Sequence, residues 1–471
     1  MNKINLKNIS HLIQANSLGH LFFFLKRLPV LFLTVFISFS ATAVEILIDS
    51  EVEGGVRKFI NPIFEAAGFD PQEIKVYIVL DNSVNAFVAN GSNIFINTGL
   101  ITLYNDPDVL KGVVAHELGH ITGGHLARNS EKIQQLTIPT MATTLLGVAA
   151  AIGGSPEAGM ALITGSSHTA ARSYLSNSRS QESAADQAAI KFLHKSNNTA
   201  AGLVKAQEYF SKREANIVSQ INPYSISHPL SRERLNIMNA ALKKEGNKYK
   251  STDEERKIYG RVVAKLRGFT EPIDSIFETN HKELDPFARK YELAIASYRK
   301  PDLTEALAKL DELIKKEKNN GYLYQLKGQF LFEHGKIFDS IESYKKSMQY
   351  LKNDYIVIAE YALALINAAS LQEDPKVKEK TLKEAIPLLH MVTNSNIKNP
   401  YIYRNLAIAY GKLGDYGNSN LMLAEEAILY GKIPEAQNFV DKAKKHVQND
   451  KKLQLRVDDT LKTLRNISNQ K

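Results

Sequence analysis

Three features are missing from this sequence of 471 residues, and each absence excludes a class of protein. There is no cysteine, so neither disulfide bonds nor a cysteine nucleophile can contribute to stability or catalysis. There is no set of apolar spans of about twenty residues, which excludes an enzyme built from several transmembrane helices. The net charge of +9 is compatible with anionic surfaces, but no basic cluster interleaved with aromatic residues indicates nucleic-acid binding.

The first 43 residues have the layout of a secretory signal peptide. Lys26 and Arg27 precede a twelve-residue apolar segment, and ATA (41–43) offers a cleavage site with small residues at its ends. A helix of that length reaches about 18 Å, whereas the hydrocarbon core of a bilayer is roughly 30 Å thick. We therefore expect export to the periplasm and a mature chain that starts near Val44. An uncleaved anchor, lengthened by LFFFL (21–25), is the alternative.

Composition and periodicity divide the rest of the chain into three regions. Residues 44–245 mix strand and helix signals, because β-branched runs at 75–81 and 93–99 are followed by helical patterns. Residues 246–286 are rich in Lys and Glu and are interpreted as a connector. Residues 287–471 have helical, repetitive patterning. The predicted fold is an α+β domain, mostly helical with a small sheet, followed by an all-α solenoid.

The C-terminal region repeats with a period of 34 residues, which is typical of tetratricopeptide repeats. Units that begin at Phe287, Gly321 and Tyr355 share a small residue at their eighth position: Ala294, Gly328 and Ala362. A further unit begins near Pro400 after extra residues, and 433–445 is predicted to be the final helix. Such repeats stack into a concave surface that binds proteins. A helical bundle with accidental periodicity is the alternative.

The stretch AHELGH (115–120) has the spacing of a metal-binding helix. Asp106 and Pro107 provide the cap and first residue that start a helix, which the following residues continue. His116 and His120 then lie on one face, four residues apart, where two imidazoles can reach one ion.

Glu117 lies next to the first of these histidines and could act as the general base on a water held by that ion. A surface helix with incidental histidines is the alternative interpretation. If the helix continued to His125, that residue would face away from His116, so we expect it to be structural.

A catalytic zinc needs a third protein ligand and an open fourth position. The segment RSQESAADQAA (179–189) is predicted to be helical and carries Glu182 and Asp186 four residues apart. Glu182 would complete a set of two histidines and one glutamate, and Asp186 could accept a hydrogen bond from a ligand histidine. A solvated surface pair is the alternative.

Together HELGH (116–120), ESAAD (182–186) and SHPLSRER (227–234) resemble the gluzincin family that includes the CAAX prenyl endopeptidases and the HtpX-type membrane endopeptidases. The resemblance covers nearly the whole mature chain and implies a zincin fold with one zinc ion per chain. It implies these roles: metal ligands His116, His120 and Glu182, general base Glu117, and supporting carboxylate Asp186.

The resemblance also implies roles outside the ligand set. Residues 85–99 look like the edge strand along which an extended substrate binds in the family. The predicted substrate strand consists of Asn93, Ile94, Phe95 and Ile96. His228 is expected either to occupy the fourth zinc position, keeping the enzyme latent, or to stabilise the oxyanion, a task that Arg234 could share.

By that resemblance the chain is an exported zinc endopeptidase that hydrolyses misfolded or stalled envelope proteins. It would support assembly of outer-membrane β-barrel proteins, with the repeats docking on the assembly machinery. The uncharged segment 137–154 is expected to pack over the cleft or to touch a membrane surface, and His168 is expected to be non-catalytic. The alternative function is a repeat-based chaperone or scaffold whose protease site is latent or vestigial.

Overall fold

A computed structural model describes residues 45–89, 91–125, 168–216, 228, 232–246, 249–395, 399–448 and 450–469. The expected signal peptide (1–43) and the apolar segment 137–154 lie outside the described residues. His168 is the first residue of a helix, but its side chain also lies outside them. Among the helices that the structure describes, none combines the length and the apolar character needed to cross a bilayer.

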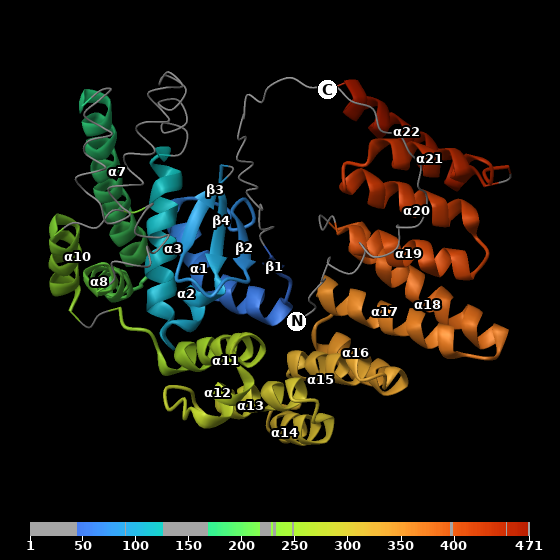
Figure 1. The fold of residues 1–471 in the computed structure, drawn as a ribbon, viewed down its shortest axis with the longest axis horizontal. Helices are drawn as coiled ribbons and strands as arrows, with labels where there is room; N and C mark the ends of the chain where they lie inside the picture. Colours follow the sequence, from blue (N-terminus) through green and yellow to red (C-terminus); the bar gives the residue numbers. More distant parts are fainter. Residues whose placement is uncertain are drawn as a thin grey trace, which may run out of the picture.

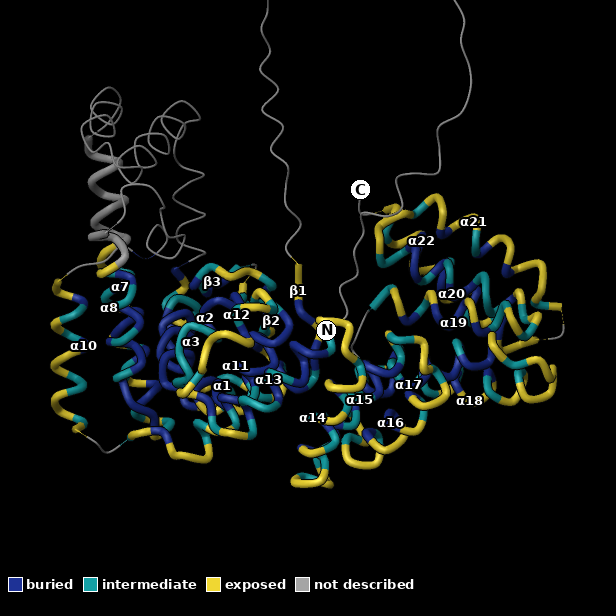
Figure 2. The backbone as a smooth tube through the Cα atoms, turned by 60° about the horizontal axis from the view of Figure 1, so that its bottom comes forward, coloured by how far each residue is buried: buried dark blue, intermediate teal, exposed yellow. Residues whose placement is uncertain are grey.

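The N-terminal part combines a small sheet with helices (Figure 1). Its strands and first helices are β1 (Ile46–Leu47), α1 (Ser50–Ala67), β2 (Lys75–Val79), β3 (Ala86–Ala89), β4 (Asn93–Asn97) and α2 (Thr98–Thr102). They are followed by α3 (Pro107–Thr122), α7 (His168–Lys195), α8 (Ala201–Asn216) and α10 (Arg232–Glu245). Buried residues concentrate where α1 and α3 pack on the sheet, whereas α10 is largely exposed (Figure 2). This part is the α+β domain that the sequence predicts.

The sheet has the strand order β1-β2-β4-β3, and this order corrects the predicted substrate strand. The residues Asn93, Ile94, Phe95 and Ile96 lie on β4, which pairs in parallel with β2 on one side and antiparallel with β3 on the other. The prediction that these residues form an edge is therefore wrong. Ile94 and Ile96 are fully buried, as suits an interior strand, and the edge beside β4 is β3.

Helix α3 carries the HELGH stretch through the middle of the domain. The side chain of Asp106 accepts a hydrogen bond from the backbone N–H of Asp108, and Pro107 opens the helix, so the predicted start is confirmed. Every residue from 107 to 119 is buried, because α3 packs against α1, α7, α8 and β3. A helix surrounded in this way holds its side chains in fixed positions.

The predicted connector is not a linker. It folds into α11 (Asp253–Thr270) and α12 (Ile273–Glu278). Thr252 and Glu255 form a reciprocal capping box at the start of α11, and the apolar face of that helix, which includes Val263 and Leu266, is fully buried. One hydrophobic cluster runs from Leu47 through α11 to Phe330. The Lys and Glu residues that suggested a connector belong to the other face of an amphipathic helix.

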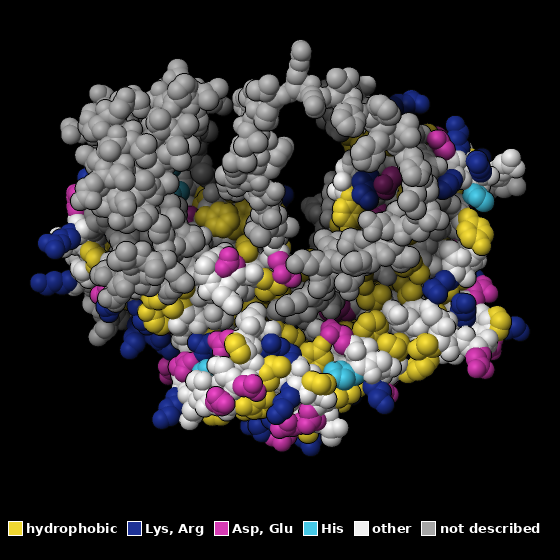
Figure 3. Space-filling model, in the orientation of Figure 1, with side chains coloured by type: hydrophobic (Ala, Val, Ile, Leu, Met, Phe, Trp, Pro, Cys, Tyr) yellow, Lys and Arg dark blue, Asp and Glu magenta, His cyan; other side chains and the backbone are white. Residues whose placement is uncertain are grey.

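The remaining chain forms pairs of helices that continue in an arc, as predicted (Figure 1). The pairs are α13 (Pro286–Arg299) with α14 (Leu303–Lys316), α15 (Gly321–Glu333) with α16 (Ile337–Tyr350), α17 (Tyr355–Leu371) with α18 (Pro375–Thr393), and α19 (Pro400–Lys412) with α20 (Tyr416–Leu429). The last two helices are α21 (Ile433–Lys444) and α22 (Lys451–Asn469). Apolar and charged side chains are interspersed over the lower face around α11 to α16 (Figure 3).

The small residues of the 34-residue period lie where paired helices touch. A Cβ added to Gly328 would lie 2.8 Å from the ring of Tyr344 on the partner helix, so the close approach requires glycine. Ala306 and Ser340, which share the twentieth position of the first two units, are also fully buried. The register slips after α17 and α18 because these two helices are longer than their counterparts, and α22 corrects the prediction that 433–445 is the final helix.

Candidate metal centre

Two helices and one further residue bring the predicted site together. His116 and His120 come from α3, Glu182 comes from α7, and His228 precedes α10. One donor atom from each lies within 4.8 Å of the others, and only His120 keeps appreciable exposure, at 11% of its side chain. Helix α7 can approach this closely because a Cβ on Gly119 would lie only 2.6 Å from the carbonyl oxygen of Ala185. The glycine of HELGH therefore admits the helix that supplies the glutamate.

The distances between donor atoms fit a tetrahedral ion. The Nε2 atom of His116 lies 3.1 Å from Nε2 of His120 and 3.3 Å from Oε2 of Glu182. The Nε2 atom of His120 lies 3.3 Å from Oε1 of Glu182. A tetrahedron with metal–ligand bonds of about 2.0 Å has edges of about 3.3 Å, and nitrogen and carboxylate oxygen are ligands that zinc accepts. The residues present therefore fit a zinc ion.

His228 lies at the remaining corner of this group. Its Nδ1 atom is 3.3 Å from Nε2 of His116 and 3.2 Å from each carboxylate oxygen of Glu182. Its other ring nitrogen, Nε2, is 3.4 Å from Oε1 of Glu117. The side chain thus lies between the group of donor atoms and the candidate base.

Two further predicted residues support the donor atoms from behind. The Oδ1 atom of Asp186 lies 2.8 Å from Nδ1 of His116, where it can fix the orientation of that ring. Arg234 is buried, with Nε 2.6 Å from Oδ2 of Asp186 and Nη1 3.0 Å from Oε2 of Glu182. These contacts favour a role for Arg234 in holding two carboxylates in place, in preference to direct stabilisation of an oxyanion.

The electrostatics of the group favour a cation. Burial alone would lower the pKa of His116, but hydrogen bonds with Asp186 and Glu182 raise it to about 10. Burial would raise the pKa of Glu182, but hydrogen bonds from His116, His120 and His228 hold it well below its usual range. Burial lowers the pKa values of His120 and His228, and the charge on His116 adds to this. A buried carboxylate that stays ionised among imidazoles attracts positive charge.

Glu117 lies on the same turn of α3 and is almost completely buried. Burial raises the pKa of its carboxyl to about 7, against the opposing effect of His120 and His116. A carboxylate with a pKa near neutrality both takes up and releases a proton readily at physiological pH. Its burial beside the ligand histidines is what a general base at this site requires.

His125 is the residue of the site that the sequence did not reveal. The expectation that it would face away from the histidines assumed a continuous helix, but α3 ends at Thr122. Gly123 and Gly124 turn the chain, and the ring of His125 folds back so that its Nδ1 lies 2.9 Å from Nδ1 of His120. The pair of glycines before His125 was the signal that could have predicted this turn.

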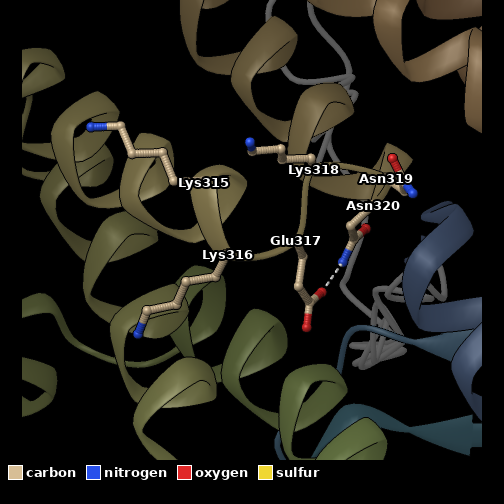
Figure 4. A pocket seen from close by; sticks show the side chains of 6 residues that line it. All are labelled: Lys315, Lys316, Glu317, Lys318, Asn319 and Asn320. Atoms are coloured by element: carbon tan, nitrogen blue, oxygen red, sulfur yellow. Dashed lines mark hydrogen bonds between the residues drawn. The ribbon is translucent and has the colours of Figure 1, made fainter.

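A surface hollow of about 570 Å³ lies far along the chain, at the turn between α14 and α15 (Figure 4). Two of its lining residues have structural partners. Glu317 pairs with Arg261 of α11, and the side chain of Asn320 accepts a hydrogen bond from Tyr322 N–H at the start of α15. The hollow therefore reflects helix capping and an ion pair that joins α11 to the repeats.

Comparisons with known proteins agree with this geometry. Residues 50–242 match the family model of peptidase family M48. The β-barrel assembly-enhancing protease of Yersinia pestis is 26% identical over 398 residues, covering 83% of this chain and 79% of that protein. The protease of the same name from Escherichia coli (strain K12) is 23% identical over 397 residues, covering 83% and 78%. The chain is thus a zinc metalloendopeptidase whose residues 50–242 are similar to peptidase family M48, and it resembles these proteases through both its catalytic domain and its repeats.

Proposed function

We propose that His116, His120 and Glu182 hold the zinc ion and that Glu117 is the general base of peptide hydrolysis. The observation that carries this proposal is the convergence of nitrogen and oxygen atoms from three side chains at separations of 3.1 to 3.3 Å, each close to the edge of a zinc tetrahedron. Asp186 and Arg234 keep the donor atoms oriented from behind. Without these contacts the ligand side chains would have to be ordered when the ion binds.

Each residue has a defined task in this mechanism. When bound, zinc supplies Lewis-acid activation of the attacking water and of the scissile carbonyl. Glu117 accepts the proton that the water loses and then delivers it to the nitrogen of the leaving amine. Burial of Glu117 raises the pKa of its carboxyl above the ordinary value, which makes the carboxylate a stronger base for this proton.

We place the substrate along β3 rather than along β4. Strand β3 is at one end of the sheet and packs against α3, so its outer side lies next to the helix that carries the site. An extended segment that paired with β3 would add a strand to the sheet through main-chain hydrogen bonds. Recognition of this kind suits unfolded or stalled chains, because it depends on an accessible backbone more than on side chains.

We propose that His228 acts as an inhibitory fourth ligand of the metal. Its Nδ1 lies 3.2 to 3.3 Å from donor atoms of His116 and Glu182, which corresponds to the position of a fourth ligand. A protein ligand there would exclude the water needed for hydrolysis, so the side chain must leave before cleavage. Replacing His228 by alanine should therefore speed cleavage of an unfolded substrate, whereas slower cleavage would assign it a role in catalysis itself.

In the cell we propose that the enzyme is exported to the periplasm and degrades misfolded or stalled envelope proteins. The likeness to β-barrel assembly-enhancing proteases over 83% of the chain supports clients among outer-membrane β-barrel proteins. The repeats would dock the enzyme on the assembly machinery or on a stalled client, since stacked repeats present extended binding surfaces. Peripheral contact with a membrane surface through residues outside the described part belongs to the same proposal.

The direct test is zinc content together with casein cleavage by purified mature protein. Wild type should contain about one zinc per chain, and Glu182→Ala should lose both zinc and activity because one of three ligands is missing. Glu208→Ala, which removes an exposed glutamate from α8, is the matched control and should behave as wild type. Absence of zinc and cleavage in the wild-type protein would reject the proposal.

A chaperone or scaffold function is the second candidate, because the helix pairs of the repeats offer a binding surface independent of the metal. A Glu117→Gln variant separates the two functions in cells that lack the native gene. Loss of envelope integrity in that variant supports proteolysis as the biological role. Full complementation by the variant would indicate that the biological role depends on the repeats and not on proteolysis.

A further inference from the structure

The ligand His120 has an unusual neighbour. Its Nε2 faces the metal-binding group, and its Nδ1 lies 2.9 Å from Nδ1 of His125. The two ring planes are 79° apart with centroids separated by 4.9 Å, so the rings meet edge to face instead of stacking. His125 is 4% exposed and is held in the protein interior.

The local backbone is adapted to this contact. Gly124 has φ +61°, a conformation that glycine adopts readily, and it reverses the chain directly after α3. A Cβ on Gly123 would lie 2.3 Å from Nε2 and 2.7 Å from Cδ2 of the His125 ring. Both glycines are therefore needed for the ring to reach its position, one for the turn and one for the space.

The protonation pattern follows from the geometry. A histidine that gives Nε2 to a metal carries its proton on Nδ1 and donates it to a neighbour. The acceptor here is Nδ1 of His125, which must be unprotonated and leaves the proton of that ring on Nε2. The same task is performed for His116 by the carboxylate of Asp186, at 2.8 Å. The two ligand histidines are thus supported by chemically different acceptors, one charged and one neutral.

We propose that His125 is a positioning residue for zinc, acting by orienting the His120 ring and by fixing which of its nitrogens is free to bind the ion. This inference rests on the ligand set proposed above. It predicts that His125 contributes to zinc affinity although it touches neither the ion nor the substrate. Partners of this kind typically change metal affinity by about 10- to 100-fold when they are removed.

The test measures zinc affinity by competition with a fluorescent chelator, using the full-length mature chain stripped of metal. His125→Ala should weaken zinc binding by about 10- to 100-fold. His125→Gln should recover part of the affinity, because its amide oxygen can accept the same hydrogen bond. Gly123→Ala should weaken binding in the same direction, because the added methyl group displaces the ring while His125 itself is retained.

The matched control is His194→Ala. His194 is a partly buried histidine of the same domain whose Nε2 lies 2.6 Å from Glu245, outside the group of donor atoms. Its variant should keep the zinc affinity of the wild type. The melting temperature of each metal-free protein is measured alongside, because a purely structural role would lower it without selectively changing affinity for zinc.

The outcomes separate the two proposals. If wild type binds zinc and His125→Ala binds it equally tightly, the positioning role is overturned and the ligand set stands. An equal loss of affinity in His194→Ala would assign the effect to general loosening of the domain and would also overturn it. If wild type binds no zinc, the ligand set itself fails. Should His125→Ala not fold, Gly123→Ala and His125→Gln decide the question by the same criteria.

Discussion

The metallopeptidase domain and the repeats differ in the kind of side chain that they bury. Around the metal centre the domain buries ionisable groups in clusters, in which Glu182 and Asp186 face histidines and Arg234. The repeats bury mostly alanine, leucine and serine at helix contacts, and among their described residues the buried carboxylates are Glu292 and Glu426. Burying a charged group is costly unless that group has a fixed partner. Clusters of buried charge therefore mark the catalytic part of the molecule, whereas the repeats are built for packing and recognition.

The largest expected effect concerns the catalytic end of this comparison. Replacing Glu117 by glutamine should lower the rate of peptide cleavage by about 10²- to 10⁴-fold, because the amide cannot accept the proton from water. Zinc content should stay at the wild-type level, since the three proposed ligands are unchanged. Steady-state cleavage of an unfolded substrate, with metal analysis of the same sample, checks both statements. Loss of zinc in this variant would mean that Glu117 contributes to metal binding, which contradicts its assignment as a base only.

A second prediction concerns a buried ion cluster that links the two regions. Lys265 of α11 lies 2.9 Å from Asp49 and 3.0 Å from Glu51, and Tyr291 of α13 donates a hydrogen bond to Glu51 at 2.6 Å. Lys265→Met should lower the free energy of unfolding by about 3–5 kcal/mol, because two carboxylates would remain buried without their cation. Chemical denaturation at neutral pH measures the change.

The matched control for that variant lies on the surface of the repeats. Lys309 pairs with Glu305 one turn earlier on α14, where both side chains are partly exposed. Lys309→Met should change the free energy of unfolding by no more than about 0.5 kcal/mol. Equal effects of the two lysine substitutions would mean that burial of the first cluster has no special importance.

The smallest effect is a pH dependence that distinguishes the partly buried Glu360 from the buried Asp49. Burial raises the pKa of Glu360 in α17 to about 7, although a hydrogen bond from Gln325 acts in the opposite direction. The folded state then binds a proton more tightly than the unfolded state. Its contribution to stability is full below the ordinary pKa near 4.5 and is lost as pH rises through about 7.

Between these pH values the free energy of unfolding of the wild type should fall relative to Glu360→Gln by an amount on the order of 1 kcal/mol, since the side chain keeps part of its exposure. Denaturation at a series of pH values tests this. Glu342→Gln, at an exposed position of α16, should follow the wild-type profile. Asp49 should behave in the opposite sense, because despite its burial the charge of Lys265 lowers its pKa, so that its contribution is lost as pH falls.

The sequence predicted those parts of the site that depend on spacing within one helix. His116 and His120 share a face because four residues separate them, and the pairing of Glu182 with Asp186 follows the same rule. The order of strands was not predictable, because Ile94 and Phe95 satisfy the pattern of an edge strand and of an interior strand alike. The position of His125 depends on the turn that two glycines make after the helix. The spacing of apolar residues along the sequence does not reveal that turn.

The connector illustrates a different limit. Its charged residues dominate the composition, but the buried face of α11 consists of apolar residues at helical spacing, among them Val262 and Leu266. Composition averages over both faces of a helix, so it hides the face that packs. The repeat period was recoverable because each unit carries the same small residues at the same contacts, as Gly328 and Ala362 show.

The hydrophobic cluster that extends from Leu47 through α11 to Phe330 is shared by the peptidase domain and the first repeats. A catalytic unit cut out at residue 245 would lose the covering of α1 by α11, and the first repeats would lose their base at the same time. The boundary that the sequence predicts at residue 245 is therefore not a place where the chain divides into independent parts. We therefore expect the peptidase domain to fold only together with its first repeats, as one unit.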